Sequence, residues 1–211
     1  QKIYRKSKKI MAESLLNSIL RTDLACFIEK CFNTLEPAEE FLHNWHIDEI
    51  AKKLRGVELG KNKRLLVNMP PRYLKSVCVS VGWVAWLLGH NPARKIIVAS
   101  HTSSLSLKHS LDTRKIMQAD WYKEIFPHFE FAPDQNEKHK FMTSQNGFRL
   151  AASVSSAITG EGADIIIVDD PLTPEQAYCT EQRQQVLRWF DQTLSTRLNN
   201  KKKGAIIVVG Q

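Results

Sequence analysis

The feature that most constrains the fold is a run of four apolar residues, Ile165 to Val168, that ends in two carboxylates, Asp169 and Asp170. The run shows no alternation of polar and apolar residues, which is typical of a strand buried on both faces. It is far shorter than the roughly 20 residues that cross a bilayer. We therefore expect a buried strand over residues 164–168, covered by helices on both sides.

Other strand and helix patterns alternate along the chain from residue 64 onward. The expected strands and helices are 64–69, 75–89, 95–100, 102–118, 174–198 and 205–209. Asn146-Gly147 lies between two β-prone runs and predicts a hairpin of residues 140–144 and 148–153. Alternating strands and helices indicate an α/β domain with a mainly parallel, doubly wound sheet and flanking helices.

The residues before this pattern are expected to form an N-terminal helical segment. Apolar residues at helical spacing predict a helix over residues 12–32. Pro37 and the two glutamates that follow it predict the start of a second helix, because acidic side chains favour the first turn. We divide the chain into a helical segment, 1–60, and an α/β domain, 61–211.

The composition excludes several classes of protein. Four scattered cysteines without metal-ligand spacing indicate reduced thiols, and no segment has the pattern of a signal peptide or a membrane span. We therefore expect a cytoplasmic protein with no membrane partner. Thirty Lys and Arg against 22 Asp and Glu give a net charge of +8, which favours a polyanionic partner such as nucleic acid. The basic residues concentrate at 2–9, 52–64 and 201–203.

The segment that follows the first strand has the layout of a phosphate-binding loop: a strand, a tight turn, and a Lys-Ser pair that opens a helix. Lys75 and Ser76 stand where a lysine would reach the terminal phosphates and a hydroxyl would hold Mg²⁺. The usual glycines are replaced, with Met69 and Leu74 at their positions. A plain strand–turn–helix is the alternative interpretation.

The two carboxylates are expected to face the same crevice as Lys75, since ligands gather at the carboxyl ends of parallel strands. Asp169 would hold Mg²⁺ through water, and Asp170 could polarise the attacking water. Alternatively, the pair only caps the helix that follows. In nucleoside triphosphatases of this build the next strand lies between these two strands, so Gln211 at its tip would contact both the phosphate and the metal site. Otherwise Gln211 is a frayed terminal residue.

These motifs belong to an ordered set that begins near residue 41. Its members are residues 45–50, 68–76, 95–100, 112–118, 159–164, 168–172, 189–191 and 195–198. As a set they resemble the ATPase half of the large subunit of a tailed-phage terminase, the motor that pumps DNA into proheads. Such terminases are similar in using Pro-Pro-Arg-x-x-Lys-Ser where other ATPases carry glycines.

The resemblance implies a P-loop NTPase-like domain that hydrolyses ATP with Mg²⁺ to drive viral DNA packaging. It implies that Lys75 binds phosphate, that Ser76 and Asp169 hold Mg²⁺, and that Arg72 senses or neutralises the γ-phosphate. Asp170 occupies the place where many terminases have glutamate. The loop residues that would surround the nucleotide are Pro70, Pro71, Arg72, Tyr73, Leu74, Lys75 and Ser76.

Further expectations also depend on the resemblance. Trp45 and His46 fall where an adenine-side contact is expected, although an aromatic residue at helical spacing is more often part of the core. Gln211 resembles the start of the coupling motif, which links hydrolysis to DNA movement. The implied partners are double-stranded DNA, a portal protein and the terminase small subunit, in the cytoplasm of a bacterial host. No second acidic cluster follows, so we expect no nuclease activity from this chain.

Two other functions stay open. One is a catalytically inactive prophage remnant that binds nucleic acid or a packaging partner, and the other is a helicase-like ATPase of the same broad fold. Against the helicase, no Asp-Glu-x-His/Asp motif is present. In the expected strand order, strand 64–69 lacks a neighbour on one side. Such an exposed edge favours self-association, with at most slow ATP turnover uncoupled from DNA.

Overall fold

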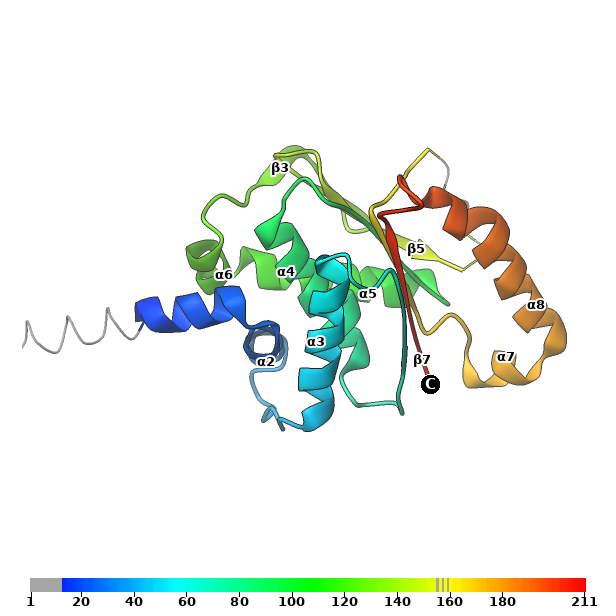
Figure 1. Cartoon of the computed structure of the whole chain (residues 1–211), viewed down its shortest axis with the longest axis horizontal. Coiled ribbons are helices and arrows are strands. Elements are labelled where there is room, and N and C mark those ends of the chain that lie inside the picture. The colour runs from blue at the N-terminus through cyan, green and yellow to red at the C-terminus, as the bar shows by residue number, and fades with distance from the viewer. Residues whose placement is uncertain (1–12, 155, 157, 159) are drawn as a thin grey trace, which may run out of the picture.

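A computed structural model of the chain describes residues 13–211 except 155, 157 and 159. The described residues form a seven-stranded sheet with the order β1-β7-β6-β2-β5-β4-β3 (Figure 1). The strands are β1 (Arg64–Asn68), β2 (Lys95–Ser100), β3 (Phe131–Asn136), β4 (Lys140–Thr143), β5 (Phe148–Ser153), β6 (Ile165–Asp169) and β7 (Ala205–Gly210).

The sheet is mainly parallel, as the sequence predicts. Strands β1, β7, β6, β2 and β5 pair in parallel, and β4 and β3 are added through antiparallel pairs. The β4–β5 hairpin and the position of β7 between β1 and β6 are both confirmed. Strand β3 and the short helix α6 (Asp120–Ile125) were not expected.

Helices cover both faces of the sheet, which confirms the doubly wound α/β fold (Figure 1). One layer contains α2 (Leu24–Leu35), α3 (Trp45–Glu58), the π-helix η1 (Val77–Gly82), α4 (Trp83–His90), α5 (Ser103–Gln118) and α6. The other contains α7 (Pro174–Tyr178), α8 (Thr180–Trp189), the π-helix η2 (Phe190–Leu194) and the 3₁₀-helix η3 (Ser195–Arg197). Each layer has its own buried cluster, so β6, with every residue buried, lies between two apolar cores.

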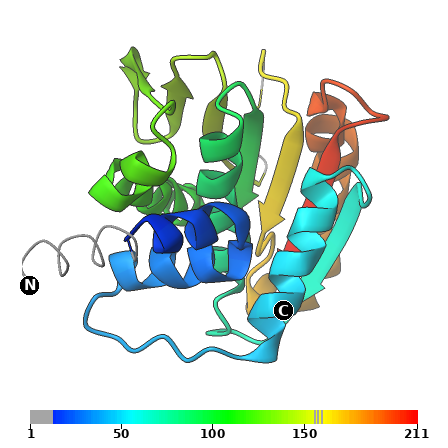
Figure 2. The same cartoon turned by 60° about the vertical axis from the view of Figure 1, so that its left-hand side comes forward.

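The N-terminal helices belong to the larger of these two cores. Phe27 of α2 and Ile47 of α3 are fully buried, and the ring of Phe27 lies 5.3 Å from that of Trp86 in α4. Figure 2 shows these helices packed in front of the strands. The proposed boundary between segments 1–60 and 61–211 stays a prediction, and the basic residues 2–9 lie outside the described residues.

Two predicted helix boundaries in this region are wrong. Pro37 does not start a helix: α3 begins at Trp45, whose N–H donates to the side chain of Asn44 at 2.8 Å. The helix expected over 12–32 is interrupted at Asp23, whose carboxylate accepts the backbone N–H groups of Ala25 and Cys26 and so starts α2.

The long helix expected over residues 174–198 is also wrong, because the chain forms several short helical pieces there. Thr173 caps α7 with a reciprocal capping box, and Cys179 then adopts an extended backbone that ends α7 before α8 begins. The helical periodicity continues across this break, so the sequence pattern does not show it.

Strand β1 lies at the edge of the sheet, as expected, and pairs only with β7 within the described part of the chain. Its Leu66 side chain is 70% exposed, which is unusual for a leucine in a sheet. Self-association through this edge stays a prediction. In the residues that the structure covers, no helix has both the length and the hydropathy of a membrane span.

Candidate active site

The loop after β1 and the two carboxylates after β6 meet at one edge of the sheet. The register pairs Asn68 with Gly210 and Asp169 with Val209, so β1, β7 and β6 end side by side. This edge lies at the lower end of the sheet in Figure 1, where the C-terminus is marked. The structure therefore brings together the two motifs that the sequence analysis placed in one crevice.

The loop between β1 and the helix that starts at Lys75 holds two non-glycine residues in the left-handed backbone region. Arg72 has φ 67° and Leu74 has φ 58°, and the carbonyl of Leu74 accepts the N–H of Cys78 as the helix begins. Such conformations cost roughly 1–3 kcal/mol each and cluster at functional sites. The chain thus makes the tight turn expected between β1 and this helix without glycines.

Asp169 is fully buried and hydrogen-bonded to the helix that follows this loop. Ser76 donates its hydroxyl to Asp169 Oδ1 at 3.2 Å, and Ser80, one turn later in η1, donates to Oδ2 at 2.5 Å. Burial, together with the neighbouring charge of Asp170, raises the pKa of Asp169, and the hydroxyls of Ser80 and Ser76 lower it, so that the pKa is about 6. The carboxylate is therefore mostly ionised at pH 7, and it is tightly held.

Asp170 faces Lys75, the predicted phosphate ligand, rather than the serines. Its Oδ2 lies 4.0 Å from Nζ of Lys75, whose side chain is only 6% exposed. Asp170 itself has a left-handed backbone, with φ 46°. Three of the four non-glycine residues with positive φ in the described chain are therefore Arg72, Leu74 and Asp170, all at this site.

A second buried polar group lies behind Asp169. Nδ1 of His109 is 3.6 Å from Asp169 Oδ2, but burial and the nearby positive charge of Arg149 lower the pKa of His109 to about 3. The imidazole is therefore neutral at pH 7, and the contact is not an ion pair. Burial also lowers the pKa of Arg149 to about 9, although the carboxylates of Asp112 and Asp169 favour its charged form. Among the described residues, the guanidinium nitrogens of Arg149 have no hydrogen-bond partner.

The Ser76 hydroxyl and the Asp169 carboxylate provide the oxygen donors that Mg²⁺ prefers. They lie 3.2 Å apart, beside the lysine that could meet a phosphate. In phosphate-transferring sites Mg²⁺ is held by one or two protein oxygens, substrate phosphates and water. Among the described residues, no group of three or more His, Cys, Asp or Glu side chains is placed so that it could hold a metal ion.

The other predicted nucleotide contacts lie around this loop. His46, at the start of α3, is buried, and its ring centroid is 5.5 Å from that of Tyr73 in the loop. Trp45 beside it is 74% exposed, and both line a shallow groove against the end of β1 together with Met69. The sequence had left open whether Trp45 is part of the core, and its exposure excludes that reading.

Four further predicted residues are exposed at this edge. Pro70, Pro71 and Arg72 have exposed side chains on the loop. Gln211 follows β7 and lines a pocket that also contains Asp170 and Gly210. Gln211 therefore lies next to the second carboxylate, on the strand between the two motifs.

The arrangement of strands and helices is similar to that of a known phage large terminase. The large terminase of bacteriophage HK97 superposes with a TM-score of 0.54 at 11% identity over 90% of this chain. The chain has the fold of a phage large terminase. It spans 37% of the length of the HK97 protein. The large terminase ATPase domain of Thermus phage P74-26 is also similar, with a TM-score of 0.49 and 14% identity over 85% of this chain and 68% of that one. No protein-family model and no curated protein sequence matches the chain.

Sequence reasoning missed four residues at or beside this candidate site: Ser80, His101, His109 and Arg149. Ser80 could have been found, because it follows Ser76 by four residues and so shares its face of the helix. His101 comes directly after β2, which ends at the same edge as β6. His109 and Arg149 show no comparable signal, since both lie on elements distant in sequence from Asp169.

Proposed function

We propose that this chain is an ATP-hydrolysing motor domain of the large-terminase type, which drives the packaging of viral DNA into proheads. The observation that carries the proposal is the convergence of Lys75, Ser76, Asp169 and Asp170 at the carboxyl ends of β1 and β6. The strained, non-glycine backbone at this site supports it independently. A structural helix cap would need neither a buried lysine nor three left-handed residues.

In this proposal the phosphate loop binds ATP. Lys75 contacts the terminal phosphates and leaves Asp170 when the nucleotide arrives, while backbone N–H groups of Pro70–Ser76 that are not used in the helix surround the phosphates. Proline has no N–H, so Arg72, Tyr73, Leu74 and the residues after them supply these donors. Trp45 and His46, beside Tyr73, provide the adenine-side contact.

Hydrolysis uses the second carboxylate. Asp170 accepts a proton from the attacking water, and Arg72 neutralises charge on the γ-phosphate. Mg²⁺ held by Ser76 and Asp169 would balance the charge on the phosphate oxygens. Gln211, beside Asp170, links the state of the site to the parts of a motor that grip DNA.

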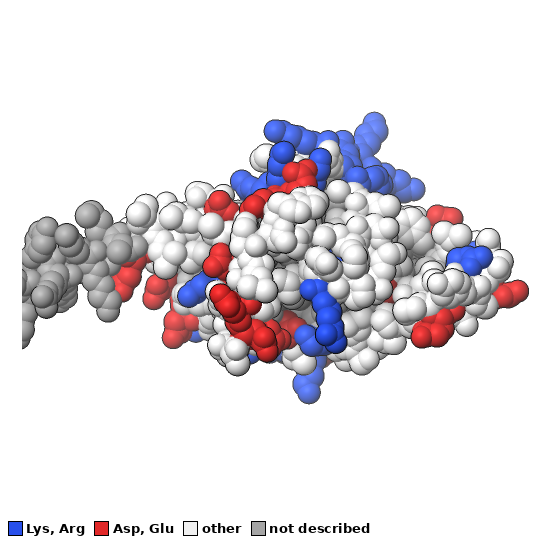
Figure 3. All heavy atoms as spheres, turned by 90° about the horizontal axis from the view of Figure 1, so that it is seen from below, with Lys and Arg blue, Asp and Glu red and all other residues white. Residues whose placement is uncertain are grey.

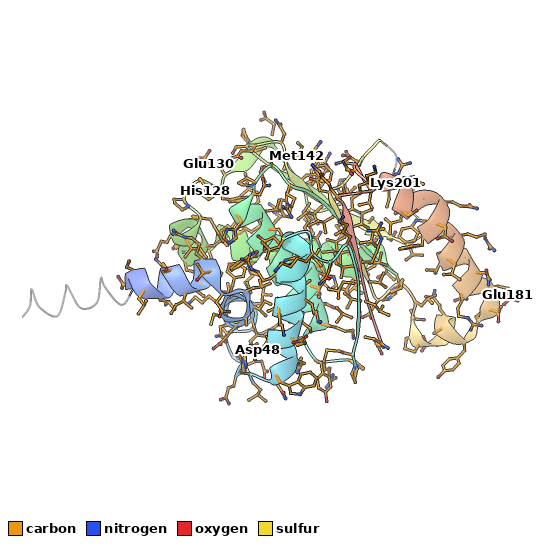
Figure 4. The ribbon with its side chains drawn as sticks, viewed as in Figure 1. Asp48, His128, Glu130, Met142, Glu181 and Lys201 are labelled. Atoms are coloured by element: carbon orange, nitrogen blue, oxygen red, sulfur yellow. The ribbon has the colours of Figure 1, made fainter. Side chains whose placement is uncertain are left out.

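Double-stranded DNA is the proposed polyanionic partner, with a portal protein and a small terminase subunit as packaging partners. The positive charge that supports DNA binding lies at the amino ends of β1 and β7. Arg64 donates to the carbonyl of Gly204 at 3.2 Å, and Gly204 directly follows Lys201–Lys203. The carbonyl of Lys63 accepts the N–H of Ile206. Lys201 lies at the end of the sheet opposite the nucleotide site (Figure 4). Basic side chains also gather at one margin of the face shown in Figure 3.

The test measures Mg²⁺-ATP binding by calorimetry and phosphate release with and without duplex DNA. We expect Lys75→Ala to weaken ATP binding by about 1.5–3 kcal/mol, the usual contribution of a charge-assisted contact. Asp170→Asn should keep ATP binding and slow turnover by on the order of 10²-fold. Lys123→Ala, on an exposed lysine paired with Asp120, is the matched control and should change neither quantity.

The same measurements separate the alternatives. An inactive remnant would bind DNA without turnover in any variant. A helicase-like ATPase would be stimulated by single-stranded rather than duplex DNA. Equal ATP affinity in the wild type and in Lys75→Ala would place the nucleotide elsewhere and contradict the proposal.

A further inference from the structure

The backbone of Asp170 is held by the two strands on either side of it. Its N–H donates to the carbonyl of Val209 in β7 at 2.9 Å. Its carbonyl accepts two hydrogen bonds from His101, at the end of β2: one from the backbone N–H at 3.2 Å and one from ring Nδ1 at 2.9 Å. The ring contact is additional to anything that sheet pairing provides.

The left-handed backbone of Asp170 decides where its carboxylate points. Successive side chains of a strand face opposite sides of the sheet. Asp169 faces the helix layer, where Ser80 and Ser76 donate to it. An extended residue at position 170 would therefore face the other layer. With φ 46°, Asp170 instead comes within 4.0 Å of Lys75, on the same side as Asp169.

We propose that His101 is a positioning residue for Asp170: its ring N–H holds the carbonyl of a strained residue and thereby keeps the second carboxylate in the phosphate crevice. This inference rests on the proposed role of Asp170 in hydrolysis. A carbonyl oxygen can only accept a hydrogen bond, so Nδ1 of His101 carries the proton in this contact. Both the neutral Nδ1–H tautomer and the imidazolium provide that donor.

The position of this pair explains why an extra donor is needed. The ladder between β2 and β6 ends at the pair Ser100 and Asp169, so His101 and Asp170 are the first residues beyond it. Beyond that pair, only the two backbone hydrogen bonds of Asp170, to Val209 and from the N–H of His101, oppose its return to the more favourable extended region. The imidazole of His101 adds a third restraint, on the carbonyl of Asp170.

Three substitutions of His101 distinguish the contribution of the Nδ1–H donor from that of the rest of the imidazole ring. The side-chain amide of asparagine places an N–H where Nδ1 stands, whereas the amide of glutamine places it one bond further out. We expect His101→Ala and His101→Gln to lower kcat for ATP by about fivefold, the effect of one net hydrogen bond, with the affinity for Mg²⁺-ATP unchanged. His101→Asn should keep wild-type kcat. The backbone N–H of residue 101 remains in all three variants.

Crystal structures of the same variants give a readout that does not depend on turnover. Asp170 should keep its positive φ in the wild type and in His101→Asn, and should leave the left-handed region in His101→Ala and His101→Gln. A positive φ at Asp170 in His101→Ala, or equal kcat values for His101→Asn and His101→Ala, would overturn the inference. If the wild-type protein hydrolyses no ATP, the proposed function fails, and the φ of Asp170 in the variants still decides the role of His101.

Discussion

Replacing Ser80 by alanine should destabilise the protein by an amount that depends on pH. Ser80 and Asp169 are both fully buried, and the Ser80 hydroxyl donates to Asp169 Oδ2 at 2.5 Å. A hydrogen bond to a charged group contributes about 1.5–3 kcal/mol, and one to a neutral group about 1 kcal/mol. Ser80→Ala should therefore lower the free energy of unfolding by about 1.5–3 kcal/mol at pH 8 and by about 1 kcal/mol at pH 5.

The direction in which the free energy of unfolding changes with pH follows from the pKa of Asp169. Burial raises this pKa from 3.8 to about 6 in the folded protein, so the folded state binds the proton more tightly than the unfolded chain does. Ionisation of Asp169 thus lowers the free energy of unfolding as the pH rises from 3.8 to about 6. The Ser80 hydroxyl lowers the pKa of Asp169, and without it this loss of stability becomes larger and extends to higher pH.

Urea unfolding followed by tryptophan fluorescence at pH 5 and pH 8 measures both values. Ser110→Ala is the matched control, because Ser110 is also fully buried but its hydroxyl has no hydrogen-bond partner in the described structure. We expect the control to change stability little at either pH. Equal losses in the two variants at both pH values would refute the argument.

Three further predictions concern packing, DNA and thiols. A Cβ on Gly89 would lie 2.5 Å from ring atoms of Phe126, so Gly89→Ala should lower the free energy of unfolding by about 1–3 kcal/mol in chemical denaturation. Replacing Lys201–Lys203 by glutamine should reduce the slope of log K against log salt for duplex DNA by about 2.7, as measured by fluorescence anisotropy, whereas an unchanged slope would exclude this turn from the interface. Limited alkylation of the native protein, followed by mass spectrometry, should modify only the two partly exposed cysteines, Cys26 and Cys179.

The parallel part of the sheet was predictable because its strands carry strong local signals. The uninterrupted apolar residues of β6 and the Asn146-Gly147 turn each define one element without help from distant residues. Helix starts were less predictable, since Pro37 is a reasonable first-turn residue and Asn44 a reasonable N-cap, and the chain uses only the second to start α3. The break at Cys179 depends on its extended backbone, which no residue type in that segment requires.

At the site, the sequence predicted which side chains meet but not how the backbone lets them meet. Lys75, Ser76 and the two aspartates come together because parallel strands end at a common edge. The left-handed conformations of Arg72 and Leu74 were missed because sequence patterns associate such turns with glycine. Without glycine, the surrounding structure must impose the conformation, and that information is spread over the whole fold.

The edge position of β1 means that the loop after it, the proposed phosphate loop, is supported from one side only. At the two ends of β1, the N–H of Met69 donates to the carbonyl of Gly210, and the carbonyl of Lys63 accepts the N–H of Ile206. Between these residues, the backbone polar groups of β1 point alternately toward β7 and away from it. The amides of Leu66 and Asn68 therefore face away from β7, and we expect them to exchange with deuterium much faster than those of Leu65 and Val67. Strand β1 is thus hydrogen-bonded along one side only within the described structure. A strand added along its outer side would stiffen the support of the proposed nucleotide site without contacting the nucleotide.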